Sequence, residues 1–238
     1  MDSNIKLPIY FKWNWNWTGK VSGLAWHPTT EGRLAFGTDE GRVGIYDTLA
    51  SSKPPMLSRT YHKGTVYNLA WAPLPSKEGM FLYSCGGNNI FVHDPSSLDA
   101  EAKNLNHLIG SKGEKNQKFP SRTEFQWKLD FSLLAVGNED GSVEIYSGCS
   151  LSLLTIIVAH KKLIQCLKWH PPFTFQSAEP SQFDSWLAVA SNDVTIKGAH
   201  HLLPSWPFLL TDGFAFYSSF QCSWQQRRTC NIHSCGHS

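Results

Sequence analysis

The phrase that decides the fold is Gly-Leu-Ala-Trp-His-Pro, at Gly23–Pro28. It returns with changes as Asn-Leu-Ala-Trp-Ala-Pro at Asn68–Pro73 and as Cys-Leu-Lys-Trp-His-Pro at Cys166–Pro171. A fourth copy is shortened to Phe125–Trp127, so that every unit carries one marker tryptophan. The markers are spaced 45, 56 and 42 residues apart and are Trp26, Trp71, Trp127 and Trp169. The chain is therefore built from repeats.

The second half of each unit predicts a β-hairpin. The segment Leu34–Asp47 is echoed by Leu134–Tyr146, and each contains an acidic residue followed by Gly41 or Gly141. Such an acidic-glycine pair tolerates the positive φ of a tight turn, and the residues after it alternate apolar and polar. Repeats of about 40–45 residues that contain four short strands are typical of β-propeller blades.

We expect four blades, at residues 19–61, 62–118, 119–159 and 160–197. Residues 1–18 carry a tryptophan at every second position from Trp13 to Trp17, which favours the last strand of a preceding blade. Packing against the first blade is the simpler interpretation of these rings, and stacking on bases is the alternative. The predicted fold class is all-β, an incomplete WD40-type propeller of about four blades.

Residues 198–238 differ from the rest in composition and pattern. Their only charged side chains are Asp212, Arg227 and Arg228, and their aromatic residues show no alternation. We therefore expect an irregular tail that contributes nothing to the propeller. Four blades in tandem also leave a strand edge at each end, which favours association or exposed apolar surface.

Composition excludes several classes of protein. The 238 residues are 41% hydrophobic and 17% charged, enough for a sizeable core and unlike a disordered chain. Six scattered cysteines indicate reduced thiols and no disulfide framework. The sequence predicts neither export nor a membrane span, because no apolar segment follows Met1 and the longest apolar stretch, His201–Phe220, is broken by two prolines and Asp212-Gly213. A net charge of +2 decides nothing about nucleic acid.

The sequence predicts no enzyme, no cofactor and no small-molecule substrate. It contains no glycine-rich phosphate loop and no nucleophile elbow. His62 and His160 recur at one repeat position, which indicates structural hydrogen bonds and not catalysis. The segment Cys230–His237 is rich in cysteine and histidine, but its spacing fits no established zinc module, so we expect no metal site.

Together these motifs resemble WD repeats. Two units open near a histidine, His62 and His160, the strand that follows resembles Leu-Ala-Trp, and two units close on an aspartate, Asp47 after Ile-Tyr and Asp94 after Val-His. Tyr46 and His93 stand where the family usually has tryptophan. Longer phrases resemble the WD-repeat gem-associated proteins of the survival-motor-neuron complex, in particular Trp26–Asp39, Thr65–Trp71, Leu82–Gly87 and Gly137–Ser142.

That resemblance implies a function in spliceosomal particle assembly. Members of the family join two propellers, recognise small nuclear RNA through its Sm site and 5′ cap, and deliver it for Sm-core assembly. The implied partners are small nuclear RNA and survival-motor-neuron complex proteins, and the implied location is the cytoplasm and the nuclear gems. The chain would correspond to the first blades of the second propeller, with weakened RNA binding. The alternatives are a non-catalytic protein-interaction scaffold and an inactive truncated product.

The candidate RNA-binding residues lie where the first strand of each blade begins. Four residues before the marker tryptophans stand Ser22, Tyr67, Thr123 and Gln165, and Tyr67 matches a family tyrosine that contributes to RNA recognition. A tyrosine at a propeller rim can stack on a base, although ordinary packing is the competing interpretation. Basic residues that precede the same strands could contact phosphates, or could be solvated charges: Lys20, Lys63, Arg122, Lys161 and Lys162.

Overall fold

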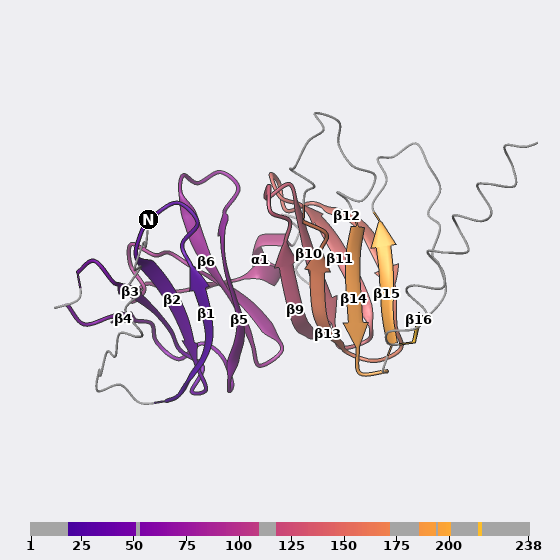
Figure 1. The fold of residues 1–238 in the computed structure, drawn as a ribbon, viewed down its shortest axis with the longest axis horizontal. Coiled ribbons are helices and arrows are strands. Elements are labelled where there is room, and N and C mark those ends of the chain that lie inside the picture. The colour runs from indigo at the N-terminus through magenta and orange to yellow at the C-terminus, as the bar shows by residue number, and fades with distance from the viewer. Residues whose placement is uncertain are drawn as a thin grey trace, which may run out of the picture.

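In the part of the chain that the structure describes, strands dominate and form four antiparallel sheets of four strands each. The computed structural model describes residues 19–50, 53–109, 118–171, 186–193, 195–200 and 214–215. The sheets follow one another along the longest axis of the molecule in the order of the sequence (Figure 1). We call them blades A to D. The predicted all-β fold with four blades is confirmed.

Each blade contains an inner strand followed by three strands further out. Blade A consists of β1 (Val21–Trp26), β2 (Arg33–Thr38), β3 (Val43–Asp47) and β4 (Met56–Leu57). Blade B consists of β5 (Val66–Pro73), β6 (Met80–Gly86), β7 (Asn89–His93) and β8 (Lys103–Asn104), and the short helix α1 (Leu105–Ile109) follows it. Blade C consists of β9 (Arg122–Trp127), β10 (Leu133–Asn138), β11 (Ser142–Ser147) and β12 (Leu153–Val158). Blade D consists of β13 (Ile164–Trp169), β14 (Trp186–Ser191), β15 (Thr195–His200) and β16 (Phe214–Ala215).

Blade D differs from the sequence-based expectation. The strands of blades A to C lie inside the predicted ranges 19–61, 62–118 and 119–159. In blade D, however, β15 continues to His200, and β16 pairs Phe214 with Ile196 and Ala215 with Thr195. Residues beyond 197 therefore do contribute to a sheet, because backbone pairing can close a blade with a strand too short to show a pattern. The expectations for residues 1–18 and for the rest of 198–238 lie outside the described residues.

The apolar core lies between the blades. The inner strands are neighbours in pairs, with β1 beside β5, β5 beside β9, and β9 beside β13. Three clusters of buried side chains fill the A/B, B/C and C/D interfaces. The indole Nε1 of Trp71 donates to the carbonyl of Ala25 at 3.1 Å, and that of Trp169 donates to the carbonyl of Gln126 at 3.0 Å. These two tryptophans therefore each join their own blade to the one before, whereas Trp127 packs in the B/C cluster and its Nε1 has no hydrogen-bond partner among the described residues.

The predicted acidic-glycine turns are present at the ends of β2 and β10. Gly41 and Gly141 have φ of +81° and +87°. Each turn packs against the loop that leads into the next blade, where the amides of His62 and His160 donate to the carbonyls of Gly41 and Gly141. A Cβ on Gly141 would lie only 2.4 Å from the carbonyl oxygen of His160. Both the backbone conformation and the close approach therefore require glycine.

Replacing Gly141 with alanine should destabilise the protein more than the same change at Gly79. The two glycines share a φ of +87°, but a Cβ on Gly79 would meet no atom within 4 Å. Gly79→Ala should therefore cost about 1–2 kcal/mol from the backbone alone. Gly141→Ala should cost at least about 1 kcal/mol more, because the blade-to-blade contact must also shift. Urea unfolding followed by tryptophan fluorescence measures the difference, and equal losses would contradict this packing.

Candidate nucleic-acid interface

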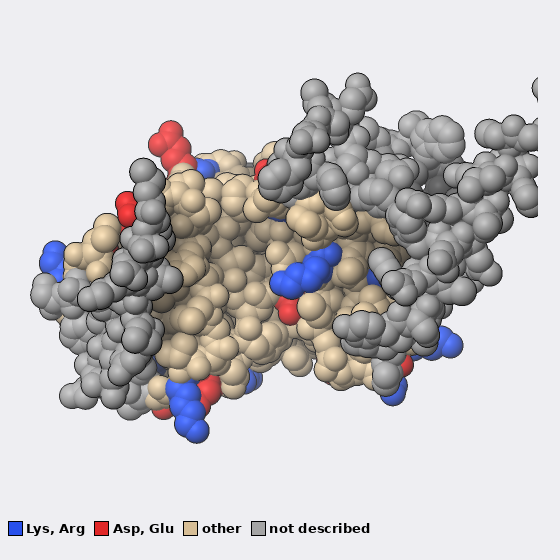
Figure 2. Space-filling view, in the orientation of Figure 1, with Lys and Arg blue, Asp and Glu red and all other residues tan. Residues whose placement is uncertain are grey.

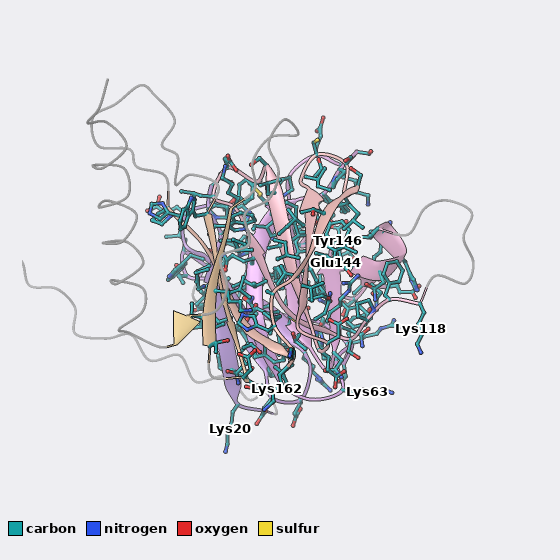
Figure 3. All side chains as sticks on the ribbon, turned by 90° about the vertical axis from the view of Figure 1, so that its right-hand side faces the viewer. Lys20, Lys63, Lys118, Glu144, Tyr146 and Lys162 are labelled. Carbon is teal, nitrogen blue, oxygen red and sulfur yellow. The ribbon has the colours of Figure 1, made fainter. Side chains whose placement is uncertain are left out.

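Exposed lysines gather at the end of the molecule where the inner strands begin. Lys20, Lys63 and Lys162 stand within three residues before β1, β5 and β13, and Lys161 is next to the last of them. Figure 3 shows Lys20, Lys63 and Lys162 at the same lower end of the molecule. All four side chains are exposed, and none forms an ion pair with a carboxylate among the described residues. They form what we call the lysine rim.

Acidic turn residues share this end and limit the basic surface. The turns that follow β2, β10 and β14 carry Asp39, Asp140 and Asp193. Asp39 accepts a hydrogen bond from the backbone amide of Lys20 at 2.7 Å, which joins the acidic turn to the start of β1. A polyanion can therefore approach best along the inner strands, because the turns further out would repel it.

Tyr67 lies on β5 beside this rim, with 44% of its surface exposed. It sits at an irregularity in the β5–β6 pairing, between Val66 and Asn68. Its hydroxyl oxygen accepts a hydrogen bond from the Cys85 thiol at 3.4 Å. Burial of the hydroxyl, followed by the neighbouring Cys85 and Glu124, raises the pKa of Tyr67 above its ordinary value. The side chain is thus anchored at its polar end, stays neutral, and leaves part of its ring accessible.

Ser22 holds the strand that carries Tyr67. Its hydroxyl donates to the carbonyl of Val66 at 2.5 Å. Thr123, at the same address in blade C, donates in the same way to the carbonyl of Ile164 at 2.7 Å. The repeated contact shows that a hydroxyl at this address braces the next inner strand. Ser22 therefore positions β5, and its hydroxyl hydrogen is already used in this bond.

Arg122 is placed differently from the other basic residues expected at the rim. Its side chain is fully buried, and its guanidinium forms an ion pair with Glu144 at 2.6 Å. It also donates to Asn106, Asn138 and the Tyr146 hydroxyl. Glu144 and Tyr146 lie on blade C, inside the molecule (Figure 3). We therefore leave Arg122 out of the RNA-contacting surface, because a phosphate cannot reach its guanidinium without breaking this network.

The structure brings further polar residues beside Tyr67 that sequence reasoning missed. The Asn68 side-chain amide donates to Glu124 and, at 2.8 Å, to the carbonyl of Phe125. Burial raises the pKa of Glu124. Lys168 lies further along the inner strands and donates to the Gln126 side chain at 3.2 Å. The only signal in the sequence was their position, one or three residues before a marker tryptophan. Figure 2 shows acidic and basic atoms together in the hollowed, mostly uncharged face of the molecule.

The recurrent histidines have structural partners, as their repetition predicted. The His62 ring donates from Nδ1 to the carbonyl of Gly86 and shares a hydrogen bond between Nε2 and the Ser84 hydroxyl, each at 2.7 Å. His160 pairs with Asp193 at 2.9 Å. No group of three or more possible metal ligands occurs within the described part of the chain, and the Cys230–His237 segment lies outside it. Within the same described ranges, no helix has the length and apolarity needed to cross a bilayer.

The repeats, the four blades and the tryptophan contacts define the class of fold: the chain forms an incomplete β-propeller of the WD40 type. A family model described as the anaphase-promoting complex subunit 4 WD40 domain matches residues 77–171. Within the class, the chain is similar to part of human Gem-associated protein 5, with 47% identity over 193 residues that cover 76% of this chain and 12% of that protein.

Two further relatives agree. Mouse Gem-associated protein 5 is 40% identical over 83% of this chain and 14% of its own length. The component of gems protein 5 from Dictyostelium discoideum is 21% identical over 58% of this chain and 15% of its own length. The chain thus spans about one seventh or less of each of these proteins. The computationally designed Ika4 protein overlaps at a TM-score of 0.49 with 14% identity, over 76% of this chain and 91% of that one.

Removing the buried guanidinium should destabilise the fold strongly. Arg122→Leu leaves the Glu144 carboxylate buried without its cation and should cost about 3–5 kcal/mol. The double variant Arg122→Leu, Glu144→Leu should recover a large part of that loss, because no buried charge remains unpaired. Lys63→Leu at the exposed rim is the control and should change stability by no more than about 0.5 kcal/mol. Urea unfolding measures all three, and an Arg122→Leu protein as stable as the parent would contradict the buried network.

Proposed function

We propose that this chain is a non-catalytic RNA-binding WD-repeat protein that recognises small nuclear RNA within the survival-motor-neuron complex. The proposal includes action in the cytoplasm and the nuclear gems, in spliceosomal particle assembly. Its similarity to part of Gem-associated protein 5 supports this reading. The single observation that carries it is the half-exposed Tyr67 ring, anchored by its hydroxyl at the lysine rim.

The rim geometry suits single-stranded RNA. An unpaired base of the Sm site stacks on the accessible Tyr67 ring, and each such stack contributes roughly 1–3 kcal/mol. The neutral hydroxyl adds no charge that would repel a phosphate. Lys20, Lys63 and the Lys161–Lys162 pair then follow the backbone on either side. Ser22 contributes indirectly, by holding the strand on which Tyr67 sits.

Binding by this chain should be weaker than binding by the longer relatives. Four blades provide one part of the surface that a whole ring and a second propeller offer. Fewer phosphate contacts lower the affinity and flatten its dependence on salt. The proposal assigns the Sm-site sequence to the Tyr67 rim, and it extends to the 5′ cap only through the resemblance of the chain to the gem-associated family.

A protein-interaction scaffold is the second candidate, and one observation favours it. An open groove of about 850 Å³ lies between blades A and B at the end opposite the lysine rim. Its walls include His27, Arg33, Lys77 and Phe81, with Arg33 over the Trp71 ring and Lys77 over the Phe81 ring. Mixed apolar and charged walls suit a peptide. RNA binding at the rim should weaken steeply with salt, whereas peptide binding in this groove should depend on salt far less.

Tyr67→Ala should weaken binding to an Sm-site RNA oligonucleotide by about 1–3 kcal/mol, because the stacking surface is lost. Tyr67→Phe is the matched control: it keeps the ring and loses only the hydroxyl, so it should bind nearly as well as the parent. Filter binding over a series of salt concentrations measures both variants, and circular dichroism checks that they are folded.

The same assay tests the lysine rim. Lys63→Ala should reduce the salt slope by about one, whereas Lys128→Ala should not, because Lys128 lies at the other end of its inner strand and pairs with Asp130 at 3.2 Å. Equal affinity of folded Tyr67→Ala and parent would reject the rim as the RNA site. Equal salt slopes for the two lysine variants would reject the proposal that the lysine rim contacts the RNA phosphates.

A further inference from the structure

Blade A exposes an apolar surface on its inner strand that the other blades bury. Val21, Leu24 and Trp26 are 46%, 64% and 63% exposed. They alternate along β1 apart from the irregularity between Val21 and Gly23, so they lie on one face of the sheet. We call these three residues the leading face of the chain. Three large apolar side chains exposed together in one place indicate an interaction surface.

The repeats show what covers this face elsewhere in the molecule. The equivalent residues of blade B are Val66, Leu69 and Trp71, and they are 0%, 8% and 4% exposed. In blade D the equivalents Ile164 and Leu167 are 0% and 1% exposed. In each case the partner is the preceding blade, since these residues belong to the clusters that fill the A/B and C/D interfaces. The residues equivalent to the leading face are therefore buried, at these two interfaces, by the adjoining face of the preceding blade.

The covering faces share a pattern of small residues on the second strand. Ala35 and Gly37 of blade A pack against blade B, and a Cβ on Gly37 would lie 2.7 Å from the Val66 side chain. Ala135 and Gly137 of blade C pack against blade D, and a Cβ on Gly137 would lie 2.7 Å from Ile164. The small residues thus make room for the aliphatic chain of the next blade, and the inner-strand carbonyl beside them receives its tryptophan.

Blade D presents the same pattern, and no further blade follows it among the described residues. Ala188 and Ala190 stand on β14 at the positions equivalent to Ala135 and Gly137 on β10. Ala188 is exposed. Lys168 is equivalent in position to Gln126, whose carbonyl accepts a hydrogen bond from the indole of Trp169. A methyl group at Ala190 is compatible with the packing, since blade B carries the larger Cys85 at that address. We call this surface of blade D the trailing face.

We propose that the leading face of one copy of this chain docks on the trailing face of a second copy. Blades A and D lie at opposite ends of the long axis, so neither face covers the other within one molecule (Figure 1). The contact is head-to-tail, and it repeats the packing already present at the A/B and C/D interfaces. Two copies supply eight blades, a number that propellers form, and such a contact closes into a ring or continues into longer assemblies.

Two charge substitutions test the docking. Leu24→Glu alters the leading face, and Ala188→Glu alters the trailing face; both sites are exposed, so neither change should unfold the monomer. Sedimentation velocity of the parent should show a mass that rises with concentration above 26.7 kDa. Each variant alone should weaken this association about tenfold or more, because an unpaired charge would be buried in the contact. Leu154→Glu on the outer strand β12, where Leu154 is 46% exposed, is the matched control and should associate like the parent.

Mixing the two variants tests the head-to-tail arrangement. Each variant retains one intact face, so the mixture should form a dimer and nothing larger, although neither variant associates alone. Association that survives Leu24→Glu, or that Leu154→Glu abolishes equally, would overturn the proposal, as would a mixture that stays monomeric. A monomeric parent would also overturn it. Slow hydrogen exchange of β1 in that monomer would then assign the cover to another segment of the same chain.

Discussion

The contact between neighbouring inner strands determines the rest of the structure. An inner strand is the edge of its sheet, so part of its backbone has no neighbouring strand to pair with. The marker tryptophan of the next blade packs into the apolar space between two blades, and at Trp71 and Trp169 the indole Nε1 also donates to a carbonyl of the preceding inner strand. Because the same contact recurs, the starts of the inner strands are brought to one end. Lys20 and Lys162 therefore lie at the same end as Lys63 and Tyr67, although they come from other repeats.

Blade B, which carries Tyr67, and the neighbouring blade C stabilise this end with different buried polar groups. Blade B uses a chain of hydrogen bonds from His62 through Ser84 to His93, and burial followed by the nearby His62 lowers the pKa of His93 to about 3. Blade C instead buries Arg122 with Glu144. Both networks fix the loop that leads into an inner strand. This rigidity lets the rim present an aromatic ring and lysines at defined positions, which lowers the entropic cost of binding a flexible strand.

The repeats made much of this structure predictable from the sequence. Prediction from the repeats failed where a residue's role depends on its contacts with other strands. The marker tryptophans gave the blades, and counting back from them gave the rim address of Tyr67. Counting could not distinguish Arg122 from a rim lysine, because its burial depends on Glu144 from another strand. The strand at Phe214–Ala215 was missed because two residues carry no periodicity, and only pairing with β15 makes them a strand. Asn68 was missed because its role depends on a contact with the next blade.

The most direct test of the account is hydrogen exchange of the whole chain with and without Sm-site RNA, read by mass spectrometry. The account predicts that RNA slows exchange at the start of the inner strands, in peptides covering Lys20–Gly23, Lys63–Asn68 and Lys161–Gln165. Exchange at the opposite end, in the groove residues Thr29–Arg33 and Lys77–Phe81, should not change. Protection confined to the groove, or none at the rim under conditions where RNA is bound, would contradict the claim that the rim is the RNA-binding surface.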